Sequence, residues 1–163
     1  MSHQDEYYGN MITMLELIWG EGYMAPGGSG NVEKMLNGIE TEGKRILDIG
    51  CGLGGPAFEM AKTFGADVVG IDLESPLIER ATETAIDMGL QDRCKFHTVE
   101  AGKLDFPNQS FDIVVSSGAI TQVKDKADIF TESVSCSFLS ESVSCISFSD
   151  TVSSTSFSDT VAS

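Results

Sequence analysis

The amino-acid sequence predicts an α/β fold built on a doubly wound, mainly parallel sheet. Two observations lead to this prediction. Short apolar runs alternate with stretches of helical spacing, and the first of these runs ends in a glycine-rich turn. Such alternation is typical of βαβ units, in which a helix returns the chain to the start of the next parallel strand. A chain of 163 residues is long enough for one domain with a buried core.

The predicted elements follow one another in a regular order. Two amphipathic segments precede the first strand, and Asn31 is suited to cap the second of them, because Asn side chains bond the free N–H groups of a first helical turn. They are Met11–Trp19 and Val32–Ile39. Four apolar runs are predicted as strands, with two helices between the first three. The strands are Arg45–Ile49, Asp67–Ile71, Lys95–Val99 and Phe111–Val115, and the helices are Pro56–Phe64 and Ser75–Met88.

The composition changes near residue 127. Residues 1–127 mix all amino-acid types, whereas residues 128–163 contain no Lys, Arg, Gly or Pro, are rich in Ser and repeat every nine residues. We therefore predict a domain at 1–127 followed by a repeat tail at 128–163. Three interpretations of the tail stay open: a small β-repeat, a disordered acidic extension and a non-native ending. The absence of turn residues disfavours the β-repeat, and the Ser-rich acidic composition suits disorder.

The charge balance excludes several classes of partner. The chain has 25 acidic and 10 basic residues and a formal net charge of -15, which disfavours nucleic acids and anionic lipid, because both are bound through Lys and Arg. No apolar run approaches the ~20 residues that span a bilayer, and the polar start is unlike a signal peptide. The four cysteines lack metal-site spacing. We expect a cytoplasmic protein without a metal site.

The glycine-rich turn is the most informative motif. Gly50, Gly52 and Gly55 form a G-x-G-x-x-G pattern that follows a strand and opens a helix. This arrangement is typical of Rossmann-like sheets, in which glycines let a ligand approach the backbone at the carboxyl end of the first strand. Dinucleotides and S-adenosylmethionine are both bound in this way, so the glycines alone do not identify the ligand.

Acidic residues at the strand ends narrow the choice. Asp48 lies two residues before Gly50, where a carboxylate would repel a phosphate by roughly 1–4 kcal/mol at contact range. S-adenosylmethionine has no phosphate and carries a sulfonium and an ammonium, which a carboxylate attracts. Asp72 ends the second strand and is suited to bind both ribose hydroxyls, and Glu100 follows the third strand, where adenine would lie. The sequence therefore favours S-adenosylmethionine over a nicotinamide dinucleotide.

Several motifs together resemble those of class I S-adenosylmethionine-dependent methyltransferases. They are LDIGCGLGG, VVGIDLES and FPNQSFDIVVSSGAI. The upstream segment YYGNMITMLELIWGEGYMAPGG resembles the entry segment of phosphoethanolamine and related small-amine N-methyltransferases. The resemblance covers about residues 5–130 and none of the tail. It implies methyl transfer from S-adenosylmethionine to a small-molecule amine.

The resemblance also implies roles for individual residues. Tyr7 would close over the active site and, with Gln122, would act as a catalytic group. The residues that would hold or border the methyl donor are Tyr23, Met24, Ala25, Asp48, Gly50, Cys51, Gly52, Asp72, Leu73, Glu100, Ala101 and Ser116. Gln122 departs from the family pattern, since a histidine is expected there, and Gly118 stands where an aspartate is expected. A glutamine cannot act as a general base, so a glycine-like amine becomes as good a candidate as a phosphoethanolamine-like one.

The sheet departs from the family pattern as well. Class I methyltransferases resemble one another in having seven strands, but the clear strands here stop at four, as if the fold were truncated after the fourth. That strand would be an edge open to self-association unless the tail or a partner covers it. Two further hypotheses stay open: a non-catalytic remnant that binds S-adenosylmethionine without turnover and, disfavoured by Asp48, an NAD-dependent oxidoreductase.

Overall fold

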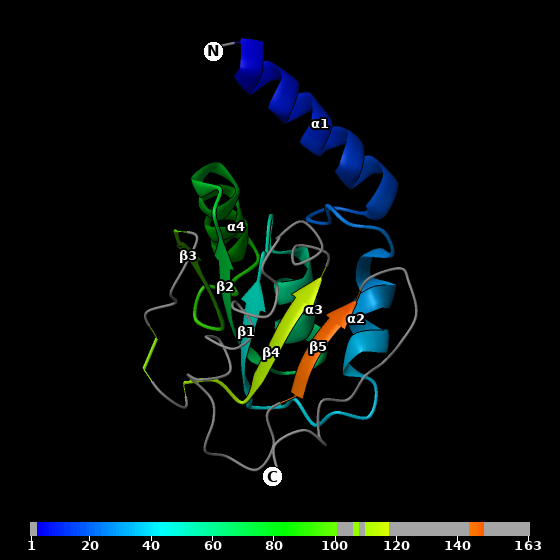
Figure 1. The fold of residues 1–163 in the computed structure, drawn as a ribbon, viewed down its shortest axis with the longest axis vertical. Coiled ribbons are helices and arrows are strands. Elements are labelled where there is room, and N and C mark those ends of the chain that lie inside the picture. Colours follow the sequence, from blue (N-terminus) through cyan, green and yellow to red (C-terminus); the bar gives the residue numbers. More distant parts are fainter. Residues whose placement is uncertain (1–2, 101–105, 108–109, 118–143, 149–163) are drawn as a thin grey trace, which may run out of the picture.

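The computed structural model describes residues 3–100, 106–107, 110–117 and 144–148, and the side chains of these residues between positions 9 and 117. Their centre is a five-stranded parallel sheet in the order β3-β2-β1-β4-β5 (Figure 1). The strands are β1 Arg45–Ile49, β2 Asp67–Asp72, β3 Cys94–Thr98, β4 Ile113–Ser117 and β5 Ser144–Phe148. Strands β2 and β3 are added on one side of β1, and the chain then crosses to the other side of β1, where it adds β4 and β5. The carboxyl ends of β1 and β4 therefore meet at a topological switch point, the usual ligand site of such sheets.

Four helices accompany the described strands: α1 His3–Trp19, α2 Gly28–Leu36, α3 Gly55–Thr63 and α4 Ser75–Asp87. The predicted helices are present with shifted ends. Asn31 lies inside α2, where its side-chain amide donates to the Pro26 carbonyl, so its predicted role as a cap is wrong. Gly27 occupies the cap position instead, with a left-handed φ of 98° that favours glycine.

The main core lies between one face of the sheet and helices α2, α3 and α4. Ile46, Val68 and Val115 point to that face and are almost fully buried among helix residues such as Met60 and Ala81. Leu47, Ile71 and Val114 lie an odd number of positions from these residues along their strands, and they belong to a second buried cluster on the opposite face. Both faces of the central strands are thus apolar, as parallel sheets require.

Helix α1 lies apart from this core, beyond the carboxyl ends of the strands (Figure 1). Its contact with the rest of the domain includes Ile12, which is buried with Leu53 of the glycine-rich turn and Leu77 of α4. The opposite side of α1 exposes Leu17 and Ile18 to solvent. The helix is therefore held by one narrow stripe above the switch point.

Strand β5 comes from the repeat tail and pairs in parallel with β4, with Ile113 opposite Ser144 and Ser117 opposite Phe148. This differs from the expectation that the sheet stops at four strands, because β4 is now an inner strand. The tail covers the edge of β4, one of the two ways of covering it that the sequence left open, and the expected exposed edge for self-association is not at β4.

Candidate functional site

The glycine-rich turn folds back onto the end of β2. The backbone N–H groups of Gly50 and Cys51 both donate to the carbonyl of Ile71, at 2.8 and 3.0 Å. Gly50 and Gly52 have φ values of 72° and 53°, in the left-handed region that glycine adopts without steric cost. These two glycines let the chain reverse between β1 and α3 and leave backbone, rather than side chains, facing the switch point.

The third glycine of the motif has a different role. The N–H of Gly55 donates to the carbonyl of Gly22 at 3.0 Å, and a Cβ on Gly55 would lie only 2.5 Å from that oxygen. Gly55 is thus required for the close approach of the α1–α2 loop to the first turn of α3. The G-x-G-x-x-G pattern therefore shapes the turn and also docks a separate segment of the chain against it.

Asp72 connects the two strand ends. One of its carboxylate oxygens accepts the N–H of Gly52 at 2.9 Å, and the other accepts the N–H of Glu74 at 3.1 Å. Each carboxylate oxygen can accept more than one hydrogen bond, so the side chain keeps free acceptor capacity. The Asp72 carboxylate is fixed in direction before any ligand arrives.

Asp48 is the most unusual polar residue of the site. It is fully buried, and neither carboxylate oxygen has a hydrogen-bond partner among the described residues. Burial, together with the negative charge of Asp72, raises the pKa of Asp48 to about 7. An unpaired buried carboxylate is costly, and such groups cluster at functional sites. A cationic ligand at the switch point would offset this cost.

The neighbouring Cys51 and Tyr23 are neutral groups at ordinary pH. Burial raises the pKa of the Cys51 thiol far above its usual value, and Asp48 and Asp72 add to the shift. Burial and Glu59 raise the pKa of Tyr23 to about 12. Neither residue can supply a base near pH 7, but the hydroxyl of Tyr23 stays a hydrogen-bond donor.

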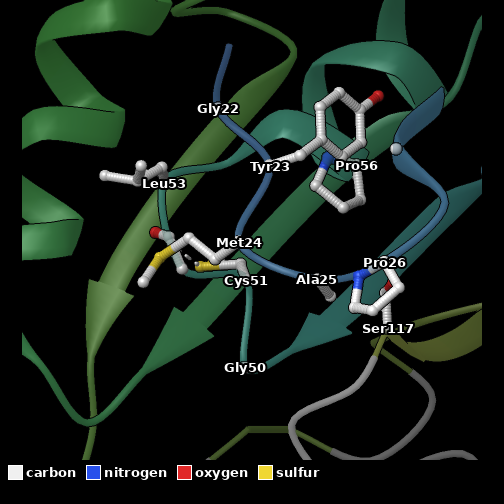
Figure 2. A pocket seen from close by; sticks show the side chains of 12 residues that line it. Gly22, Tyr23, Met24, Ala25, Pro26, Gly50, Cys51, Leu53, Pro56 and Ser117 are labelled. Atoms are coloured by element: carbon white, nitrogen blue, oxygen red, sulfur yellow. Dashed lines mark hydrogen bonds between the residues drawn. The ribbon is translucent and has the colours of Figure 1, made fainter. Parts of the chain in front are cut away.

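A pocket opens at this place between the glycine-rich turn and the α1–α2 loop (Figure 2). Its walls consist of small or apolar residues and backbone. They are Gly22, Tyr23, Met24, Ala25, Pro26, Gly28, Gly50, Cys51, Gly52, Leu53, Pro56 and Ser117. The sulfur of Met24 lies over Gly52, where an added Cβ would be 3.2 Å from it. The turn can therefore accept no side chain at Gly52 without displacing Met24.

Six of the predicted donor-binding residues line this pocket: Tyr23, Met24, Ala25, Gly50, Cys51 and Gly52. Asp72 and the exposed Leu73 lie at the end of β2, and Glu100 is exposed after β3. Asp48 and Ser116 do not line the pocket, since both are fully buried, and Ser117 is the residue of β4 that does. Ala101, Gln122 and Gly118 lie outside the described residues. Tyr7 lies in α1, but its side chain is outside the described part.

The individually predicted site residues omit half of the lining: Gly22, Pro26, Gly28, Leu53, Pro56 and Ser117. Gly22, Pro26 and Gly28 belong to the stretch that carried the family resemblance, so the signal was present in the sequence. Among the described residues, no group of three His, Cys, Asp or Glu side chains gathers as a metal site. The same part of the chain contains no helix long and apolar enough to cross a membrane.

Comparison with known proteins identifies the family. A family model described as "Methyltransferase domain" matches residues 40–154, a range that includes all five described strands and extends into the repeat tail. The chain is 35% identical over 126 residues to phosphoethanolamine N-methyltransferase 3 of Arabidopsis thaliana, covering 77% of this chain and 25% of that protein. It is 37% identical over 91 residues to a sterol 24-C-methyltransferase of Gibberella zeae, covering 56% of this chain and 24% of that protein.

A solved structure gives the same assignment. Phosphoethanolamine N-methyltransferase 2 of Haemonchus contortus, in complex with S-adenosyl-L-methionine, is 31% identical with a TM-score of 0.71, covering 77% of this chain and 29% of that chain. The chain thus spans about a quarter of the length of the curated relatives it matches. The fold and these matches define the class, and the chain belongs to the methyltransferase domain family, with the fold of class I S-adenosylmethionine-dependent methyltransferases.

Proposed function

We propose that this chain binds S-adenosylmethionine at the switch point and transfers its methyl group to a small-molecule amine. The observation that carries the proposal is the buried Asp48 carboxylate, which has no partner among the described residues and lies beside a glycine cradle and a second carboxylate. These features fit a cationic ligand without phosphate. The same features disfavour an NAD-dependent oxidoreductase, because a pyrophosphate would have to approach Asp48.

Residues at the strand ends, next to the pocket, would hold the different parts of the ligand. Asp48 would face the positively charged amino-acid part of the donor, and Asp72 would accept the ribose hydroxyls while it keeps its bonds to the turn. Leu73, Glu100 and Ala101 would border the adenine. The backbone of Gly50 and Gly52 leaves the space that the ligand needs.

The chemistry is an in-line displacement, in which the donor supplies a methyl group bound to a sulfonium. The lone pair of the amine nitrogen forms the new C–N bond while the electrons of the S–C bond pass to the sulfur, and the amine loses one proton. The contribution of the chain is to hold the nitrogen opposite the sulfur and to exclude water. Tyr7 and Gln122 are proposed to orient the amine by hydrogen bonds, because Gln122 cannot take up the proton.

Titration calorimetry with S-adenosylhomocysteine and, in parallel, NADH tests the donor site. Binding of the homocysteine compound alone supports the proposal, and binding of NADH alone would refute it. A methyl-transfer assay with labelled donor then compares phosphoethanolamine, glycine and N-methylglycine as acceptors. Labelling of an amine supports the acceptor class. The relatives named above include both N- and C-methyltransferases, so a sterol serves as the contrasting acceptor.

The second candidate function is donor binding without turnover. Gln122 favours it, since the related N-methyltransferases are expected to carry a histidine at that position. Donor binding with no labelled product from any acceptor would support this alternative over the enzyme. A cytoplasmic location is also part of the proposal, and cell fractionation tests it.

A further inference from the structure

Glu16 connects three parts of the domain through one side chain. It lies on α1, and its side chain is only 14% exposed. One carboxylate oxygen accepts the N–H of Gly22 at 2.9 Å, and the other lies 2.6 Å from a guanidinium nitrogen of Arg80 on α4. The carbonyl of Glu16 also accepts the N–H of Gly20 at 2.8 Å. A residue of the outlying helix is therefore bonded to the α1–α2 loop and to a core helix.

Both of its partners lead directly to the donor pocket. Gly22 begins the run of loop residues that lines the pocket, and its carbonyl accepts the N–H of Gly55 at the start of α3. Arg80 belongs to the helix that begins after Asp72, whose carboxylate accepts the N–H of Glu74. Glu16 thus closes a chain of contacts that runs around the pocket from its loop wall to its ribose-binding acid.

The loop needs such an anchor because of its composition. Gly20, Gly22, Gly27 and Gly28 all have positive φ values. Glycine loses more conformational freedom on ordering than any other residue, so ordering a loop with three of them, and a fourth at the start of α2, on a ligand has a high entropy cost. A hydrogen bond from Gly22 to a partly buried carboxylate restricts the loop before the ligand binds.

We infer that Glu16 is a positioning residue of the donor pocket, which holds Gly22–Pro26 against the glycine-rich turn. This inference rests on the proposed donor binding at the same site. The bond to Gly22 is the working contact, that is, the contact through which Glu16 positions the loop, because it is charge-assisted and shielded by the low exposure of Glu16. The contact with Arg80 contributes less, since the Arg80 side chain is 48% exposed and exposed ion pairs are weak.

Four variants of the full chain separate these contacts. E16A removes both, E16Q keeps an acceptor for Gly22, and R80M removes only the ion pair. E21A is the matched control, because Glu21 is an exposed acid of the same loop. We expect E16A to raise the dissociation constant of S-adenosylhomocysteine roughly tenfold or more, whereas E16Q, R80M and E21A stay within about threefold of the unmodified chain.

Hydrogen–deuterium exchange without ligand supplies a readout that does not need donor binding. Exchange at Gly22–Pro26 should increase in E16A and not in E16Q or E21A, even at temperatures where all variants are folded. Unchanged exchange in E16A would overturn the inference, and so would a donor affinity equal to that of E21A. A loss in R80M as large as that in E16A would also overturn it, because the ion pair would then be the working contact. If the unmodified chain binds no donor, the proposed function fails, and exchange alone decides the role of Glu16.

Discussion

Replacing Asp48 by Asn should remove a specific pH dependence from the stability of the ligand-free protein. Asp48 is fully buried, and its pKa is raised from 3.8 to about 7. The folded protein therefore holds a proton on Asp48 between about pH 4 and pH 7, where the unfolded chain has released it. Because the folded state binds more protons in this range, its stability falls as the pH rises through it and is constant above about pH 7.

The size of the effect follows from the shift. A rise of about three pKa units corresponds to about 4 kcal/mol between the two limits, with a slope of at most about 1.4 kcal/mol per pH unit. Asn is close to Asp in volume and neutral at every pH, so D48N should be more stable than the unmodified chain at pH 8, with the difference shrinking toward pH 5. Cys51, Cys94 and Asp72 are the neighbouring titratable groups. The Cys51 thiol is neutral in this range because its pKa is raised.

Chemical denaturation at several pH values between 5 and 8 measures this dependence. The acidic chain as a whole also responds to pH, so the informative quantity is the difference between D48N and the unmodified chain. D87N is a suitable control, because it replaces an exposed acid at the end of α4, away from the site. Equal slopes for D48N and the unmodified chain would refute the reasoning and would mean that the Asp48 carboxylate has a partner in solution.

The same titration should govern donor binding. If the cationic donor requires the ionised Asp48, its dissociation constant should rise up to tenfold for each pH unit below about 7. Binding at pH 6 should then release a proton, which calorimetry in buffers of different ionisation enthalpy detects. A donor affinity that is constant from pH 6 to pH 8 would show that the ionised Asp48 does not bind the positive charge of the donor.

Three further changes test other parts of the site. Asp72→Ala should raise the donor dissociation constant roughly 10–100-fold because it loses the ribose clamp and the bond to the turn, and an unchanged constant measured by calorimetry would remove Asp72 from the site. Gly55→Ala should lower the free energy of unfolding, measured by chemical denaturation, by roughly 1–3 kcal/mol, since its Cβ would lie 2.5 Å from the Gly22 carbonyl. Gly30→Ala should not lower it, because the space around its Cβ is open. Deletion of residues 128–163 should expose β4 and cause concentration-dependent association visible by light scattering; a monomeric, equally stable product would show that β5 contributes nothing.

Much of the fold was predictable because local signals agreed with one another. The apolar run Arg45–Ile49 coincides with β1, and α3 and α4 begin next to Pro56 and Pro76, as proline preferences indicate. Asn31 misled because its side chain binds backward to Pro26, within the helix, and a left-handed Gly27 begins the helix. Strand β5 was left open as one interpretation of the tail, since the Ser-rich repeat has no two-residue alternation that distinguishes a strand from disorder.

Ser117 lines the pocket in place of the predicted Ser116, and this difference shows which structural information the sequence does not carry. Side chains alternate between the two faces of a strand, so the choice between neighbouring serines depends on the register of β4. Asp48 is in register with Val115, and Ser117, two residues further on, therefore lies on the face of Asp48 and of the pocket. Ser116 falls on the opposite face with Val114. Strand four was predicted at Phe111–Val115, two residues early, and no local pattern fixes its pairing with β1.

Glu16 illustrates the same limit at longer range. In the sequence, Glu16 is one of 25 acidic residues. An acid on an amphipathic helix is usually a solvated side chain, so nothing in the sequence distinguishes it. Its importance arises from Arg80, which lies 64 residues away in sequence, and from a glycine of the following loop. Glycines and strand-end acids are recognisable because their function is imposed by local backbone geometry. A residue that works by joining three elements becomes visible only when those elements are placed, and in this domain it is such a residue that ties the outlying helix to the donor pocket.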